Sequence, residues 1–309
     1  MLADEVTEAI RQGRPVVALE TTLVSHGFPG GQGLAVALAA ERRVRAAGAT
    51  PATVGVVDGA LRVGLTEAQL ARFAEAGESA RKAGARDLAA CVVQRALGAT
   101  TVGGTLAACR QAGIRFVATG GTGGVHRGFA DTLDISGDLP QLARTPAMVV
   151  SSGAKSILDT AATAELLETL GVPVLGWRTA TLPLFYTGAG GPPVSAVVNS
   201  AGEAAAVAAA HWQLAGPSGL LLGRPPEPGL DIEPLLTEAV QRARARGVTG
   251  QAVTPAVLAL VHELSGGRSI EVNARLIEDN AALAAEVAAA YCRDPGAGEA
   301  GAADPGTAH

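Results

Sequence analysis

Short apolar runs rich in β-branched residues alternate along the chain with alanine-rich stretches of helical periodicity. The runs read as strands at 15–20, 114–121, 147–152, 172–177 and 219–223. The stretches between them read as helices at 33–48, 87–98, 102–113, 156–171, 201–216 and 269–292. This alternation predicts a three-layer α/β/α fold, in which helices cover both faces of a mostly parallel central sheet.

One segment departs from this alternation and predicts an antiparallel hairpin. Residues 52–66 form two short strand-like runs on either side of Asp58-Gly59, a dipeptide typical of tight hairpin turns. Thr66 then stands where a helix over 66–77 needs an N-cap. No linker interrupts the pattern before residue 293, so we expect one domain over 1–293 and a disordered Gly/Ala/Pro-rich tail over 294–309.

Composition narrows the class of protein. Hydrophobic residues make up 48% of the 309 residues, which suffices for a sizeable core, while aromatic residues make up 3%. A net charge of −5 without any basic run argues against nucleic-acid binding, although a local pocket for a small anion stays open. No apolar run reaches the ~20 residues of a membrane span, and the first residues resemble an amphipathic helix rather than a signal peptide. We therefore expect a soluble cytoplasmic protein.

Isolated polar residues along this pattern have ordinary structural explanations. The three cysteines, Cys91, Cys109 and Cys292, fit no zinc spacing and are expected to be small buried hydrophobes. His211 and His262 lie inside helical patterns, which favours structural roles for both. Asn273 and Asn280 are two turns apart on one predicted helix, where capping or packing is the default interpretation.

Lysine is rare in this chain, since only Lys82 and Lys155 occur among the 24 Lys and Arg residues. Lys155 follows the strand-like run 147–152, and ligands of parallel sheets gather at such strand ends. A lysine can lose its proton and attack a carbonyl carbon, whereas an arginine cannot. Lys155 is therefore a candidate Schiff-base residue, against the alternative that two lysines occur here by chance. Asp159, four residues on, would lie on the same helical face and could form an ion pair.

Two further strand ends carry candidate groups. Glu20 closes the run 15–20, where partial burial would suit a general acid. The run 114–121 leads into a glycine cluster over 120–124, which either cradles phosphate or forms a tight turn. Three carboxylates follow, Asp131, Asp134 and Asp138; they either hold Mg²⁺ or Mn²⁺ or form a solvated acidic loop.

Taken together, several segments resemble the pseudouridine-5′-phosphate glycosidase family over roughly residues 5–293. They are PVVALETTLVSHGFP, PATVGVVDGALRVGL, RKAGARDL, GATTVGGTL, FVATGGTGGVHRGFADTLDISGDL, SSGAKSILD, ETLGVPVLGW and EVNARLIEDNAALAAEVA. The resemblance implies reversible cleavage of the C–C glycosidic bond of pseudouridine 5′-phosphate, giving uracil and ribose 5-phosphate. It also implies an α/β/α core, a divalent cation, typically Mn²⁺, and a homotrimer.

The same resemblance assigns roles to individual residues. Glu20 matches the proton donor, Lys155 the nucleophile that forms an imine with ribose, and Asp134 the metal ligand. The matched substrate contacts are Lys82, Val102, Ser136, Gly137 and Asp138, with His126 and Asn273 as polar residues lining the pocket. Residues 185–191 are richer in glycine than is usual in the family, so contacts to uracil there are left open. Two other readings are an aldolase-type lyase that forms an imine with another sugar phosphate, and a non-catalytic phosphosugar-binding protein.

Overall fold

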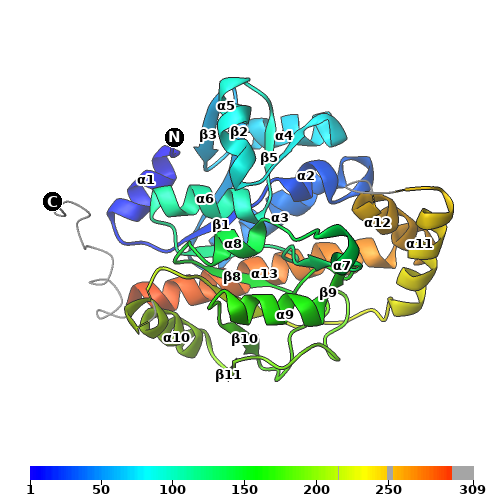
Figure 1. The fold of residues 1–309 in the computed structure, drawn as a ribbon. Coiled ribbons are helices and arrows are strands. Elements are labelled where there is room, and N and C mark those ends of the chain that lie inside the picture. The colour runs from blue at the N-terminus through cyan, green and yellow to red at the C-terminus, as the bar shows by residue number, and fades with distance from the viewer. Residues whose placement is uncertain (215, 249–252, 294–309) are drawn as a thin grey trace.

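The computed structural model describes residues 1–214, 216–248 and 253–293, so the tail predicted over 294–309 lies outside the described residues. The strands of the main sheet run through the centre of the molecule (Figure 1). They are β1 (Val16–Leu19), β2 (Thr50–Val57), β3 (Ala60–Val63), β4 (Arg81–Ala83), β5 (Gly98–Thr100), β6 (Phe116–Ala118), β8 (Met148–Ser151), β10 (Val174–Trp177), β11 (Ala196–Val198) and β12 (Leu220–Gly223). A separate two-stranded sheet pairs β7 (Val125–His126) with β9 (Leu158–Asp159).

Helices connect these strands and cover the sheet. They are α1 (Asp4–Arg11), α2 (Thr22–His26), α3 (Gln32–Ala46), α4 (Glu67–Ala76), α5 (Leu88–Val93), α6 (Val102–Ala112), α7 (Phe129–Thr132), α8 (Asp138–Leu142), α9 (Thr160–Thr169), α10 (Ala201–Leu214), α11 (Glu233–Ala245), α12 (Val253–Leu264) and α13 (Arg268–Arg293). Short 3₁₀ turns occur at Pro29–Gly31, Gly77–Ser79 and Ala85–Asp87. Among the described residues, no helix is long and apolar enough to cross a membrane.

The main sheet is mostly parallel, as the alternating pattern predicts. Its order is β11-β10-β12-β8-β6-β1-β2-β5-β4, with β3 beside β2. The neighbours from β11 to β2 all pair in parallel, while β2 pairs antiparallel with both β3 and β5. Strands β1, β6, β8 and β12 therefore end at one edge of the sheet, and the residues that follow each strand meet there.

Apolar side chains on the two faces of the sheet form two separate clusters. Successive residues of β1 alternate between them, since Val17 and Leu19 join one cluster while Val16 and Ala18 join the other. Helices α3, α10 and α13 pack on the first face, and α1, α6, α8 and α9 pack on the second (Figure 1). The predicted three-layer α/β/α architecture is confirmed.

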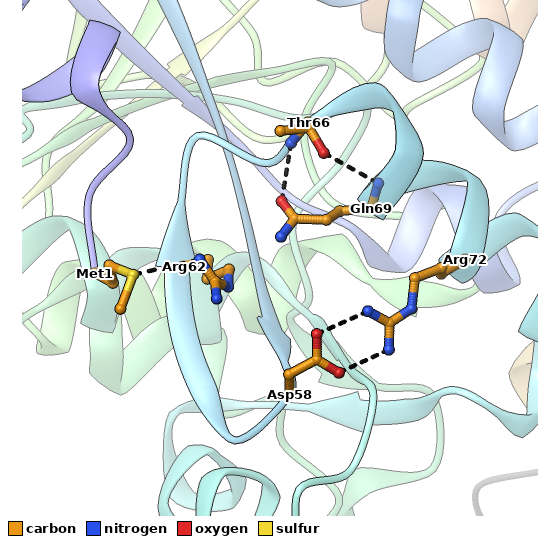
Figure 2. Close-up of polar contacts among 6 residues, drawn as sticks. All are labelled: Met1, Asp58, Arg62, Thr66, Gln69 and Arg72. Carbon is orange, nitrogen blue, oxygen red and sulfur yellow. Dashed lines mark hydrogen bonds and ion pairs between the residues drawn. The ribbon is translucent and has the colours of Figure 1, made fainter.

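The hairpin predicted around Asp58-Gly59 joins β2 to β3. Both turn residues have positive φ, 55° and 78°, a conformation that Asp and Gly accept at low cost. Arg72 of α4 donates two hydrogen bonds to the Asp58 carboxylate, at 2.9 and 3.0 Å (Figure 2). Thr66 and Gln69 form a reciprocal capping box at the start of α4, which confirms the predicted N-cap (Figure 2).

Two predicted helices have different boundaries in the structure. The stretch 156–171 is helical only from Thr160, because Leu158 and Asp159 pair as β9 with β7 instead. Asp159 caps α9 by accepting a hydrogen bond of 3.0 Å from the backbone N–H of Ala162. The prediction that Lys155 and Asp159 share a helical face is therefore wrong. The stretch 87–98 is helical only to Val93, since Arg95 adopts a φ of 52° and the chain then enters β5.

The isolated polar residues follow their expected structural roles with one exception. Cys91 and Cys109 are buried, and burial raises the pKa of the Cys109 thiol to about 12. Cys292 is exposed near the end of α13, so the prediction of a third buried cysteine is wrong. The His211 and His262 rings contact serine hydroxyls at 2.8 and 2.6 Å, consistent with local structural roles.

Candidate active site

Glu20 lies directly after β1, at the sheet edge where the parallel strands end. Its side chain is 4% exposed, although its neighbours in β1 are all apolar. Both carboxyl oxygens accept hydrogen bonds from threonine hydroxyls, Oε2 from Thr22 and Oε1 from Thr119. The two hydroxyl donors thus fix the orientation of the carboxyl group, which any group that transfers a proton to or from a ligand requires.

Lys155 is carried by the turn that follows β8. Gly153 has a φ of 88°, and a side chain there would lie 1.9 Å from the Pro183 carbonyl oxygen, so only glycine fits. The Lys155 backbone N–H donates to the Thr122 carbonyl at 3.1 Å. This turn sets the lysine beside the glycine-rich segment, and its side chain is half-buried.

Lys82 lies in β4, the last strand in the order of the main sheet, where it pairs with Ala99 of β5. The residue is exposed overall, yet the pKa of its amine is lowered, first because neighbouring protein atoms desolvate the amine and then because the charge on Lys155 repels it. The carboxylates of Asp138, Glu20 and Asp134 act in the opposite direction and raise it.

The structure brings the predicted residues together, although they are spread from position 20 to position 155 in the sequence. The charge on Lys82 interacts with those of Lys155, Glu20, Asp134 and Asp138. The segment after β6 contacts three of them: Thr119 donates to Glu20, the Gly123 N–H donates to Asp138, and the Thr122 carbonyl accepts from the Lys155 N–H. Glu20, Asp138 and Lys155 therefore meet at one site where the parallel strands end, and Lys82 and Asp134 carry charges that interact with this group.

The glycine-rich segment after β6 owes its composition to close packing. A side chain at Gly121 would meet the Phe185 ring at 2.5 Å, and one at Gly123 would meet the Ser136 hydroxyl at 2.0 Å. Gly124 faces Thr163 equally closely, at 2.4 Å. A tight, packed turn is thus sufficient to explain these glycines. Phosphate binding by the segment stays a prediction.

Asp138 ties this glycine-rich segment to helix α6. Its Oδ1 accepts hydrogen bonds from the Gly103 N–H at 2.7 Å and the Thr101 hydroxyl at 3.2 Å. Its Oδ2 accepts one from the Gly123 N–H at 2.9 Å. The carboxylate is 7% exposed and already has three protein donors. A contact between Asp138 and a substrate stays a prediction, while its role in holding the site together is direct.

The predicted substrate contacts near Asp138 differ in which of their atoms a ligand could reach. The Val102 side chain is 1% exposed in the core, so any contact there would use its backbone N–H in the first turn of α6. Helix N-termini favour anions, which suits a phosphate. Ser136 is half-buried and Gly137 is exposed, so both are accessible beside Asp138.

The acidic loop predicted to bind a metal does not gather its three carboxylates. Asp131 lies on α7, Asp134 follows that helix, and Asp138 begins α8 with its oxygens engaged. Within the described ranges, no group of three or more His, Cys, Asp or Glu side chains could hold a metal ion. Asp134 is instead paired with His126, whose Nδ1 lies 3.7 Å from Oδ2. A single exposed carboxylate fits a hard cation that keeps most of its water ligands.

Two threonines and His26 at this edge are not among the site residues that the sequence predicts, whereas the family resemblance assigns Asn273 to the pocket. Thr22 and Thr119 hold Glu20, and a hydroxyl directly after a strand was the only available signal for Thr119. His26, which ends α2, has its pKa lowered by burial and by the charge on Lys82. Asn273 is 9% exposed, and its Oδ1 lies near Gly120, within 3.4 Å of where a Cβ would stand.

The fold and the site define a class of protein. It is an α/β protein whose parallel strands end at a polar site that combines amine and carboxyl groups. The family model described as "Indigoidine synthase A like protein" matches residues 5–290. The chain belongs to this family.

Curated relatives cover nearly the whole chain. One from Chloroflexus aurantiacus, named pseudouridine-5′-phosphate glycosidase, is 48% identical over 93% of this chain and 97% of its own length. A relative from Saccharopolyspora erythraea with the same name is 46% identical over 94% of this chain and 97% of its own length. The resemblance to that family is confirmed.

Solved structures share the fold. The prealnumycin C-glycosynthase AlnA, crystallised with ribulose 5-phosphate, has a TM-score of 0.87 and 41% identity, covering 94% of this chain and 96% of its own. An indigoidine synthase A-like protein from Thermotoga maritima has a TM-score of 0.83 and 34% identity, over 91% of this chain and 94% of its own.

Proposed function

We propose that this protein cleaves the C–C glycosidic bond of pseudouridine 5′-phosphate, reversibly, to give uracil and ribose 5-phosphate. The names of the curated relatives support this reaction. The observation that carries it is that Glu20 and Lys155, an acid and an amine, are both held by the segment that follows β6. The Thr119 hydroxyl donates to Glu20, and the Lys155 N–H donates to the Thr122 carbonyl. A C–C bond to C1′ cannot be broken by protonating a leaving nitrogen, so the enzyme must supply another route for the electrons.

Ring opening provides that route. The Glu20 carboxyl group donates its proton to the ribose ring oxygen as the C1′–O4′ bond breaks, and the uracil ring supplies electrons that form a C1′=C5 double bond. The neutral amine of Lys155 then adds to C1′, and those electrons return to the uracil ring. Thr22 and Thr119 would keep the Glu20 proton directed towards the sugar.

Release of uracil follows from the same amine. Once uracil C5 has taken up a proton, the C1′–C5 bond breaks, and its electrons restore the C5=C6 bond of uracil. The lysine nitrogen, which has lost the extra proton it carried after adding to C1′, donates its lone pair to C1′, and this gives an iminium between Lys155 and the open-chain sugar. Water adds to this iminium, releases ribose 5-phosphate and restores the amine. An arginine at position 155 could not take part, because it does not lose its proton.

The phosphate is expected to bind on the Lys82 side of the site. Lys82 supplies a positive charge, and the Val102 backbone N–H supplies a donor at the start of α6, where the Gly103 N–H is already bound to Asp138. A divalent cation such as Mn²⁺, held by Asp134, would neutralise phosphate charge when bound. The remaining residues of the predicted site that could contact the substrate are Ser136, Gly137, His126 and Asn273. A homotrimer is also expected, and analytical ultracentrifugation of the purified chain would check it.

The test is release of uracil from pseudouridine 5′-phosphate, followed by absorbance with and without Mn²⁺. Borohydride added with ribose 5-phosphate should reduce the imine and leave a sugar-phosphate adduct on Lys155, which peptide mass spectrometry detects. Lys155→Arg should abolish both signals, and Glu20→Gln should lower kcat far more than it changes KM. An aldolase-type lyase would form the adduct with other sugar phosphates and release no uracil. A non-catalytic binding protein would give neither signal.

A second candidate function is C–C bond formation with another carbon nucleophile. It is favoured by the likeness to AlnA, a C-glycosynthase crystallised with a pentulose phosphate. The imine between Lys155 and ribose 5-phosphate could be an intermediate in both reactions. An electron-rich carbon of another molecule could add to it, just as uracil adds to it when the glycosidase reaction runs backwards. Incubation with ribose 5-phosphate and either uracil or a phenolic acceptor, analysed by mass spectrometry, separates the two candidates.

A further inference from the structure

Asn280 lies in the middle of α13, far from both ends of the helix, and its side chain is fully buried. Its Nδ2 donates to the Thr119 carbonyl at 2.9 Å and contacts the Ser152 hydroxyl oxygen at 3.2 Å. These partners follow β6 and β8, the strands that lead to the glycine-rich segment and to Lys155. One amide group therefore joins two neighbouring strand ends at the site.

The two chain segments that Asn280 joins remain paired beyond their strands. The Thr119 N–H donates to the Val150 carbonyl at 3.0 Å, and the Ser152 N–H donates to the Gly120 carbonyl at 2.9 Å. Thr122 then exchanges hydrogen bonds with the lysine turn, donating to Gly153 at 3.0 Å and accepting from Lys155 at 3.1 Å. Parallel pairing thus continues from the sheet to the Lys155 backbone.

One of these segments also controls the proton donor. The Thr119 hydroxyl donates to Glu20, and the Thr119 carbonyl accepts from Asn280. Thr119 therefore links Asn280 to the Glu20 carboxyl group by hydrogen bonds, and Asn280 also lies against the segment that carries Lys155. We propose that Asn280 is a positioning residue, which fixes the Glu20 carboxyl group relative to the Lys155 amine. This inference rests on the proposed function.

The polar character of Asn280 supports this role over simple packing. A buried polar group stabilises a fold only when its hydrogen bonds are made. Within the described parts of the chain, Asn280 Nδ2 has two protein acceptors, whereas no protein donor reaches Oδ1. Leucine, of similar volume, would fill the space but could make neither hydrogen bond. An asparagine is therefore needed at this position for its Nδ2 hydrogen-bond donor.

Two variants test the inference, with a control on the same helix. Asn280→Leu removes both polar groups and keeps the volume, while Asn280→Asp keeps the shape and removes the Nδ2 donor. Val287→Ala, a fully buried change two turns further along α13, controls for loss of stability alone. Both Asn280 variants should lower kcat for uracil release at least tenfold, because the Glu20 carboxyl group and the Lys155 amine lose their relative position. KM should stay within threefold, because the contacts to substrate persist. Val287→Ala should retain kcat within threefold.

Hydrogen exchange provides a readout that does not need the reaction. The Ser152 and Lys155 amides bridge the two segments, so both should exchange at least tenfold faster in Asn280→Leu than in Val287→Ala at matched stability. Unchanged exchange at these amides overturns the inference, whatever the activity. Faster exchange with an unchanged kcat overturns it as well, since loosened segments would then still react. If the unaltered protein releases no uracil, the proposed function fails, and exchange together with the rate of borohydride trapping decides the role of Asn280.

Discussion

Replacing Asp138 is expected to damage the fold and the site together. The carboxylate is 7% exposed and accepts hydrogen bonds from Gly103, Thr101 and Gly123. Each hydrogen bond to a charged group contributes about 1.5–3 kcal/mol, but bonds to one group are not additive. Asp138→Ala would also leave two buried backbone N–H groups without an acceptor. We therefore expect the free energy of unfolding to fall by about 3–5 kcal/mol.

The asparagine variant refines this prediction. Asp138→Asn retains one carbonyl oxygen, which can accept a hydrogen bond from Gly103. Its NH₂ group then faces the Gly123 N–H, a second donor, so that hydrogen bond is lost. It should lose about 1–3 kcal/mol, less than alanine. Urea denaturation with linear extrapolation measures both values, and Asp131→Ala, an exposed acid in the same loop, is the control. A loss below ~0.5 kcal/mol for Asp138→Ala would refute the reasoning, because that is the range of ordinary surface substitutions.

Three further changes have defined outcomes. Thr66→Ala removes the capping box of α4 and should lower the free energy of unfolding by about 1 kcal/mol in urea titrations. Gly123→Ala places a methyl group 2.0 Å from the Ser136 hydroxyl, so it should destabilise the protein by about 1–3 kcal/mol and displace the Asp138 loop. His26 has a lowered pKa in the folded state, so protons favour the unfolded chain, and stability should fall as the pH drops through and below the ordinary histidine value.

Each of these outcomes has a matched comparison. Glu75→Ala, at an exposed position within α4, should leave stability nearly unchanged where Thr66→Ala does not. Gly137→Ala meets no atom within 4 Å and should be tolerated where Gly123→Ala is not. His26→Gln should flatten the dependence of stability on pH between 7 and 5, and an unchanged slope in that variant would show that other groups cause it.

The strands that lead to the site could be predicted because they are buried on both faces. All four residues of β1 and of β8 are buried, so they appear in the sequence as unbroken apolar runs, and Glu20 and Lys155 are conspicuous after them. β4 was not predicted, since it has three residues with two exposed, and a strand this short has no periodicity. Lys82 was therefore found by its rarity and by resemblance, without a structural position.

The contacts between distant segments could not be derived from the chain. Asn280 bonds to Thr119 across 161 positions, and a single asparagine inside a helical pattern gives no sign of its partner. Asp138 is similar, because its three donors come from two other segments. Asp159 shows the opposite error, in which helical spacing suggested an ion pair until the pairing of β9 with β7 ended the helix early. Local periodicity predicts elements, while the tertiary structure decides which polar atoms meet.

The two lysines allow the candidate site to be labelled selectively through their amines. Arginine supplies the other basic side chains, so Lys82 and Lys155 are the two side-chain primary amines of the sequence. An amine-selective reagent therefore modifies side chains of the candidate site. Labelling rates can follow ligand occupancy in the native enzyme, without any engineered probe.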